Sequence, residues 1–328
     1  RKQGLSVRPF KKGPDFIDAA WLSMAAEKPC RNLDLFFMSE PTIRQSFVHA
    51  GRHTDVAVIE GNRGLFDGVD ARGTYSTAGL AKLLDAPVIL VADCTKSTCT
   101  VAAAVLGCQH FDPQVSIRGV ILNRTGGARH VSVLREAIEQ HCGLPVLGAL
   151  ARIPGLLFPE RHLGLVPPPE HEQFPQAIRQ AGEVAERYLD LEAIWDLACQ
   201  APAIECDGPY LGAANGSNEK SIRIGVFRDA AFQFYYPENL EALTREGAHL
   251  VEISPLQDPE VGEVDALYIG GGFPETLAAA LSQNTAFLDS LRRSIEGGLP
   301  VYAECGGAVF LGEKLLFDQQ AYPMTGAL

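Results

Sequence analysis

The 328-residue sequence lacks the features that would point to a membrane, to nucleic acid or to a disulfide framework. No apolar run reaches the roughly 18 residues of a membrane span, and the longest candidates, such as residues 86–92, suit buried strands. Basic residues are few: 28 lysines and arginines face 40 acidic residues, which excludes a polyanion as the main partner. The eight cysteines form no C-x-x-C pair. We therefore expect a cytoplasmic protein that acts on small molecules.

Two further absences concern phosphate binding and the start of the chain. The sequence contains no G-x-x-x-x-G-K-[ST] phosphate loop, and it has no initiator methionine. Residues 1–4 have the pattern of the last turn of a helix with Gly4 as its end. We expect a chain that is truncated at this end, with the phosphate loop before Arg1.

Length and composition favour two domains. A hydrophobic content of 46% is ample for two cores. The segment DGPYLGAANGSNE, residues 207–219, consists of turn formers and small polar residues and is the best boundary. We predict a first domain over residues 1–206, a linker over 207–220, and a second domain over 221–328 that is truncated at its C-terminus.

Short runs rich in Val, Ile and Leu alternate with helical stretches, which predicts an α/β fold with two doubly wound domains of parallel strands. The predicted strands are residues 5–9, 56–59, 88–92, 120–122, 222–227, 250–253, 266–269 and 300–303, and the predicted helices of the second domain include 237–246 and 274–281. Ligands bind at the carboxyl ends of such strands, so the site should lie in the segments that follow them.

The segment Glu304-Cys305-Gly306-Gly307 follows a predicted strand and opens an apolar helical run, which is the pattern of a nucleophile elbow. Backbone N–H groups at the helix start favour the thiolate, and Gly306 lets a substrate approach. Gly271 and Gly272 end another strand and could complete an oxyanion hole. The alternative is a buried cysteine in a glycine turn, but the combination favours the nucleophile.

A thiol nucleophile needs a histidine base, and all eight histidines precede Cys305. Only His249 lies in the second domain, at the start of a predicted strand and therefore at the wrong end for the site. We expect His249 to be a surface residue and the base to lie beyond Leu328.

Charged residues that suit a phosphate site follow the strands of the first domain. Lys11 and Lys12 can neutralise phosphate, and Asp15, Asp18 and Glu60 offer hard oxygen ligands, with Glu60 and Asp15 as candidates for holding Mg²⁺. The alternative for each is a solvated turn or a polar strand exit. At the last strand end of the domain, Asn123 and Arg124 either read a nucleotide base or cap a loop.

Together these residues resemble the cobyrinate a,c-diamide synthase family. The resemblance rests on PFKKGPDFID (9–18), IEGNRGLFDG (59–68), ILNR (121–124), PERHLGL (159–165), DAAFQFYYPENL (229–240), YIGGGFPE (268–275) and YAECGG (302–307). It implies a P-loop-type, dethiobiotin-synthetase-like ATP domain joined to a class I glutamine amidotransferase domain.

The resemblance also implies the reaction. The enzyme would use ATP, Mg²⁺ and glutamine to convert the a and c acetate carboxylates of cobyrinate into amides during cobalamin biosynthesis. Asp15, Asp18 and Glu60 would serve Mg-ATP and carboxylate phosphorylation, Asn123 would face adenine, and Cys305 would release ammonia from glutamine.

Several assignments stay open at this point. Arg161 and His162 either contact substrate carboxylates or brace the domain junction. Tyr236 belongs to an aromatic cluster, with Phe232, Phe234 and Tyr235, that could stack on a tetrapyrrole, although packing around a turn is the better interpretation. The oligomeric state is open, with a homodimer as the working expectation.

Three rival functions remain. The same chemistry on nickel-sirohydrochlorin would use nearly the same motifs. A regulatory or partition-type ATPase would need neither the glycines before Phe273 nor Cys305. A binding module with an inactive thiol would keep both without using them.

Overall fold

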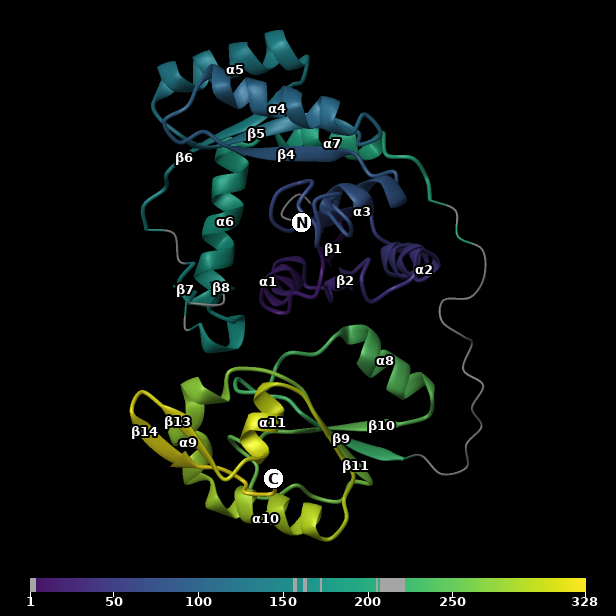
Figure 1. Ribbon diagram of the computed structural model, residues 1–328, viewed down its shortest axis with the longest axis vertical. Helices are drawn as coiled ribbons and strands as arrows, with labels where there is room; N and C mark the ends of the chain where they lie inside the picture. Colours follow the sequence, from purple (N-terminus) through teal and green to yellow (C-terminus); the bar gives the residue numbers. More distant parts are fainter. Residues whose placement is uncertain (1–3, 156–157, 162–163, 172, 205, 207–221) are drawn as a thin grey trace. The chain divides into compact units, whose positions relative to one another are not determined.

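A computed structural model describes the chain except residues 1–3, 156–157, 162–163, 172, 205 and 207–221. The chain forms two compact units, Arg1–Leu211 and Gly212–Leu328 (Figure 1). The predicted linker, 207–220, lies outside the described residues, as does His162. In the part of the chain that the structure describes, no helix is long and apolar enough to cross a membrane.

The first unit begins with a parallel three-stranded sheet in the order β2-β1-β3, formed by Arg31–Leu33, Val7–Lys12 and Val56–Glu60. Helices α1 (Ile17–Ala26) and α2 (Glu40–Gly51) follow β1 and β2. The core of this part is fully buried and contains Phe10, Leu33, Ile43, Leu80 and Leu84. Ser39 caps α2 by accepting a hydrogen bond from the Thr42 amide, which fixes where that helix begins.

A second parallel sheet of the same unit has the order β4-β5-β6, with strands Val88–Asp93, Ile117–Thr125 and Val146–Ala151. Helices α4 (Cys99–Phe111) and α5 (Ala128–Cys142) pack together beside it (Figure 1). Helix α3 (Thr77–Leu83) joins the two halves, because Ala78 packs into the core of this sheet while Leu80 packs into that of the first.

The remaining elements of the first unit are short strands and two helices. These are β7 (Glu160–Arg161), β8 (Gly164–Leu165), the 3₁₀ turn η1 (Pro168–Glu170), α6 (Phe174–Tyr188) and α7 (Leu191–Cys199). Trp21 of α1 anchors this region, because its indole N–H donates to the Val166 carbonyl over 3.0 Å.

The second unit is built on a parallel sheet in the order β10-β9-β11-β12. Its strands are His249–Ile253, Arg223–Phe227, Ala266–Ile269 and Val301–Ala303 in that order. The other elements are α8 (Pro237–Arg245), η2 (Pro274–Leu277), α9 (Ala278–Gln283), α10 (Thr285–Glu296), α11 (Gly306–Leu311) and the hairpin β13 (Lys314–Phe317) with β14 (Gln320–Pro323). Phe227, Phe287 and Phe310 are fully buried in its core.

The α/β fold class is confirmed, and the differences from the predicted elements are local. The first strand was predicted to end at residue 9, but β1 runs to Lys12, so Lys11 and Lys12 lie within the strand and not after it. Pairing explains the extension, because Lys11 is aligned with both Asn32 of β2 and Glu60 of β3. The predicted helix over 274–281 divides into η2 and α9.

Candidate functional site

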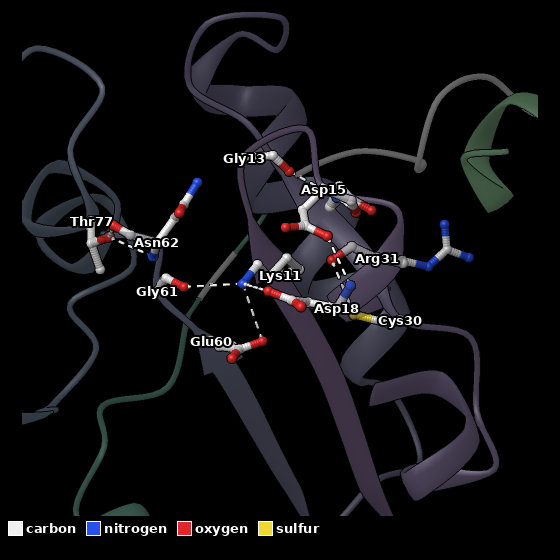
Figure 2. Close-up of polar contacts among 11 residues, drawn as sticks. Lys11, Gly13, Asp15, Asp18, Cys30, Arg31, Glu60, Gly61, Asn62 and Thr77 are labelled. Carbon is white, nitrogen blue, oxygen red and sulfur yellow. Dashed lines mark hydrogen bonds and ion pairs between the residues drawn. The ribbon is translucent and has the colours of Figure 1, made fainter. Parts of the chain in front are cut away.

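The buried ammonium group of Lys11 is the centre of a charge cluster in the first unit (Figure 2). Lys11 is 3% exposed, and its Nζ lies 2.7 Å from Asp18 Oδ2 and 3.2 Å from Glu60 Oε2. It also donates to the Gly61 carbonyl over 3.4 Å. The sheet register produces this meeting, because Glu60 is the partner of Lys11 on β3 and paired residues point to the same face. The sequence-predicted residues Lys11, Asp18 and Glu60 therefore come together.

The charges of this cluster depend on one another. Burial lowers the pKa of Lys11, but the Asp18 hydrogen bond and the charges of Glu60, Asp18 and Asp15 outweigh burial and raise it above its usual value. Burial raises the pKa of Glu60, and the attraction of Lys11 offsets only part of that rise. Lys11 is thus a fixed cation whose main contacts are the two carboxylates.

A buried amide that the sequence analysis missed holds the loop between β1 and α1. Asn32 Nδ2 donates to the carbonyl of Gly13 over 2.7 Å and to that of Asp15 over 2.8 Å. Asp15 Oδ1 then accepts from the Asp18 amide over 2.8 Å, which fixes the start of α1. Burial raises the pKa of Asp15, and the hydrogen bond from the Asp18 backbone acts against this rise. The only sequence signal was a polar residue inside the short segment RNLD, residues 31–34.

The loop after β3 is tied to α3 by Thr77. The Asn62 amide donates to Thr77 Oγ1 over 3.2 Å, and this hydroxyl lies at the same distance from the Asn62 carbonyl. A Cβ at Gly61 would lie 2.9 Å from Thr77 Cγ2, so only glycine fits between β3 and α3 without a shift. The sequence analysis did not single out Thr77 or Asn62.

Lys12 does not join the Lys11 cluster. Adjacent residues of a strand point to opposite faces, so the Lys12 side chain leaves the sheet on the other side. Burial lowers the pKa of Lys12, the charge of Asp34 raises it, and the nearby charge of Arg63 lowers it. The two lysines that the sequence analysis grouped together therefore have different environments.

Asn123 and Arg124 lie near the end of β5, on the other sheet of the first unit. Asn123 Oδ1 accepts from the Arg124 amide over 2.9 Å, and Arg124 Nη1 lies 3.1 Å from Asp93 Oδ2. Arg124 is held at a φ of +55°, with its side chain 65% exposed. The ion pair joins the ends of β4 and β5, and among the described residues the pair has no contact with Lys11 or Glu60.

The acidic side chains of the described residues bear on whether this unit can hold a metal ion. Among the described residues, no group of three His, Cys, Asp or Glu side chains is arranged to hold a metal ion. Mg²⁺ bound to a nucleotide usually takes only one or two protein carboxylates and fills its other positions with phosphate and water. The donor set of Glu60 with Asp15 or Asp18 is compatible with that mode of binding.

Cys305 occupies a sharp turn between β12 and α11 in the second unit. Its backbone has φ +46° and ψ −113°, a left-handed conformation that is rare for a residue with a side chain, and its side chain is exposed. Gly306 and Gly307 follow directly and are buried. The Glu304 amide donates to the Ile269 carbonyl over 2.9 Å, which ties the end of β12 to β11. A strained exposed thiol at the carboxyl end of a parallel strand has the geometry of a nucleophile elbow.

The glycines after β11 pack against this turn. A Cβ at Gly271 would lie 3.6 Å from Cys305 Cβ, and one at Gly306 would lie 2.7 Å from the Gly272 carbonyl oxygen. The Gly271 carbonyl accepts from the amides of Gln233 and Phe234 over 3.1 and 3.0 Å. In a trans peptide the N–H is antiparallel to the carbonyl, so the Gly272 N–H points away from residues 233–234. The described hydrogen bonds to residues 233–234 therefore use the Gly271 carbonyl and not the Gly272 N–H.

The Tyr235 hydroxyl supports the same loop through two hydrogen bonds. Its Oη donates to the Phe227 carbonyl over 2.5 Å and accepts from the Gly270 amide over 2.8 Å. Burial raises the pKa of Tyr235 well above its usual value, so the hydroxyl stays protonated. The aromatic cluster is mainly structural, because Phe232 is fully buried against Phe227 and Phe310. Tyr236, a candidate substrate contact, is half-buried immediately before α8.

Two other candidates have clear placements. His249 is exposed at the start of β10, at the opposite edge of the parallel sheet from Cys305, as the sequence analysis predicted. Arg161 lies in β7, and its side chain is outside the described part of the chain, as is His162.

Comparison with known proteins matches both units to domain families. Residues 223–328 match the CobB/CobQ-like glutamine amidotransferase domain, and residues 40–160 match an AAA domain. These matches confirm the predicted pairing of an ATP-binding domain with a glutamine amidotransferase domain.

Full-length relatives extend the match to almost the whole chain. Cobyrinate a,c-diamide synthase of Magnetococcus marinus is 45% identical over 99% of this chain and 70% of its own length. The proteins of that name from Archaeoglobus fulgidus and Methanothermobacter thermautotrophicus are 41% and 43% identical, over 99% and 94% of this chain and 70% and 69% of their own lengths. With such identity along both units, the chain belongs to the cobyrinate a,c-diamide synthase family.

Proposed function

We propose that this protein amidates the a and c acetate carboxylates of cobyrinate, with ATP to activate each carboxylate and glutamine to supply ammonia. The observation that carries the proposal is Cys305, an exposed thiol held at φ +46° beside Gly271 and Gly272. Such strain is retained where the surrounding structure holds it for a function. The family relationship supplies the substrate.

In the activating half of the reaction, an oxygen of the substrate carboxylate attacks the γ-phosphorus of ATP. The bond to the bridging oxygen breaks, ADP leaves, and an acyl phosphate forms. Positioning and charge neutralisation dominate this kind of step. The Lys11 ammonium group holds the carboxylates of Asp18 and Glu60 in place, at 2.7 and 3.2 Å from its Nζ, so neither carboxylate has to move as phosphate binds. Glu60 and Asp15 would hold Mg²⁺, which neutralises phosphate charge when bound.

In the ammonia-forming half, the Cys305 thiolate attacks the side-chain amide carbon of glutamine. The oxyanion would be stabilised by the N–H groups of Gly272 and Gly306, with Gly271 leaving room beside the sulfur. Ammonia leaves, and water hydrolyses the thioester to glutamate. The ammonia then attacks the acyl carbon of the acyl phosphate, and inorganic phosphate leaves. A histidine base would have to take the proton of the thiol.

The decisive test compares the full-length protein with its Cys305→Ala variant. The wild type should form cobyrinate diamide, ADP and glutamate from cobyrinate, ATP and glutamine. The variant should lose glutamine-dependent amidation and glutamate release, yet keep amidation with added ammonium. Undiminished glutamate release by the variant would exclude the assigned nucleophile and favour a binding module with an inactive thiol.

The substrate and assembly need separate measurements. Parallel assays with cobyrinate and nickel-sirohydrochlorin distinguish the two macrocycles, and the proposal requires faster turnover of cobyrinate. ATP hydrolysis that ignores both macrocycles would favour a regulatory ATPase. Light scattering tests the expected homodimer.

A further inference from the structure

Three aromatic side chains form an exposed patch in the first unit, and we call Phe36, Phe37 and Tyr75 the aromatic patch. Phe36 is 63% exposed, Phe37 70% and Tyr75 37%. The Phe36 ring stands edge-on to both neighbours, with ring centroids 5.0 Å from Phe37 and 5.6 Å from Tyr75. Large rings left together in water carry an unfavourable hydration free energy, so a contiguous patch of this kind marks a binding surface.

The backbone fixes the aromatic patch in place. Asp34 Oδ1 accepts from the Phe36 amide over 2.7 Å, which turns the chain directly after β2. Tyr75 is held at a φ of +62° immediately before Ser76, whose side chain caps α3. Both segments are therefore attached to the elements that build the Lys11 cluster: Asn32 lies on β2, and Thr77 begins α3.

Two cations belong to segments that adjoin those of the aromatic patch, because Lys12 is paired with Leu33 of β2 and Arg63 follows Asn62, whose amide donates to Thr77 of α3. Lys12 and Arg63 are close enough for their charges to interact, and Lys12 also feels Asp34, the residue that turns the chain into Phe36. In the described part of the chain, no carboxylate lies within 4.0 Å of the charged group of Lys12 or Arg63. The positive charges of Lys12 and Arg63 together exceed the one negative charge of the buried Asp34, so the local net charge favours binding of an anion.

We propose that the aromatic patch and the cations Lys12 and Arg63 form the docking face for the macrocycle, the rings contacting its flat conjugated plane and the cations its peripheral carboxylates. The ligand class follows from this combination. A nucleobase would cover one ring and bring no carboxylate, whereas a carboxylated tetrapyrrole offers both a broad apolar plane and anionic edges. The inference rests on the proposed function, because it assigns the place where the macrocycle of that reaction docks.

Direct binding to the full-length protein tests the face. Cobyrinate, and the same macrocycle with all its carboxylates amidated, would be titrated by equilibrium dialysis with detection of their visible absorbance. The Phe36→Ala/Phe37→Ala double variant should weaken both ligands about tenfold, since each aromatic contact is worth roughly 0.5–1.5 kcal/mol. Arg63→Gln should weaken cobyrinate alone, by about threefold or more. Phe317→Ala, which removes a ring 42% exposed in the second unit, is the matched control and should change neither.

Two further readouts separate docking from folding and from ATP binding. Glutaminase activity and the KM for ATP should be unchanged in every variant, and Phe36→Leu should give an intermediate loss because it keeps apolar volume without a flat ring. Unchanged dissociation constants in variants of a wild type that converts cobyrinate would overturn the docking face alone. An increased KM for ATP with unchanged macrocycle binding would reassign the patch to the nucleotide. Absence of cobyrinate binding by the wild type would remove the proposed function as well.

Discussion

Replacing Lys11 by methionine is the sharpest test of the charge cluster around its buried ammonium group. The change keeps most of the side-chain volume but removes the cation between Asp18 and Glu60, whose carboxylates lie 2.7 and 3.2 Å from its Nζ. A hydrogen bond to a charged group contributes about 1.5–3 kcal/mol, and breaking a fully buried pair costs about 3–5 kcal/mol. Here the side chains of Asp18 and Glu60 keep 32% and 47% exposure, so water can solvate them. We expect a loss of about 2 kcal/mol in the free energy of unfolding.

The measurement is urea unfolding followed by tryptophan fluorescence. The two tryptophans, Trp21 and Trp195, both belong to Arg1–Leu211, so the signal reports that unit. The matched control is Lys82→Met, which breaks the Lys82–Asp112 pair at 2.5 Å in the same unit. Because that lysine is 35% exposed, its removal should cost less than about 1 kcal/mol.

The pH dependence adds a second check. Without Lys11, Asp18 and Glu60 repel each other when both are ionised, and burial already raises the pKa of Glu60. The stability difference between variant and wild type should therefore shrink as the pH falls toward the range where Glu60 is protonated. If Lys11→Met cost no more than Lys82→Met at pH 7, Lys11 would not be the organising charge of the site and the reasoning would be refuted.

Three other substitutions test neighbouring parts of the argument. Glu60→Gln should raise the free energy of unfolding at pH 7, because the pKa of Glu60 lies above the ordinary 4.5 and its ionised form is therefore less stable in the folded protein. This gain in stability should vanish below pH 4.5, and ATP-dependent amidation should be lost. A loss of stability at pH 7 would contradict the prediction. Gly272→Ala should abolish glutaminase activity, since its Cβ would lie 2.0 Å from the Ala231 carbonyl oxygen. Gly298→Ala is the control for backbone strain alone, because Gly298 has a φ of +94° but no atom within 4 Å of an added Cβ, and it should keep that activity at some cost in stability. An active Gly272 variant would rule out the close approach. Tyr235→Phe should destabilise the second unit by about 1–3 kcal/mol, because the Gly270 amide and the Phe227 carbonyl lose their hydrogen-bond partner. Unfolding would be followed by far-UV circular dichroism. The variant should also lower kcat for glutaminase more than it changes KM, and unchanged activity would show that the hydroxyl is dispensable.

The sequence alone determined the features that depend on short stretches of chain. Alternation of apolar runs with helical segments predicted parallel sheets, and a strand followed by Cys305, Gly306 and Gly307 predicted a nucleophile at a turn. The sheets and the sharp turn at Cys305 are confirmed, because side-chain period, glycine content and the strand-to-helix turn are properties of neighbouring residues, whereas the role of Cys305 as nucleophile stays a prediction. The direction of one strand likewise predicted that His249 lies at the start of β10, at the opposite end of the strands from Cys305.

Only the tertiary structure decided which polar residues meet. Pairing with β2 and β3 extended β1 to Lys12, and the register then placed Lys11 between Asn32 and Glu60 while Lys12 left the opposite face. Asn32 and Thr77 are distant in sequence from the loops they hold, and the one local signal was the polar residue inside the segment RNLD. The contact of Phe36 with Tyr75 likewise joins residues that are far apart in the sequence. Local patterns specify elements, but strand register and contacts between distant segments choose the partners of each charge, because those depend on the packing of the whole unit.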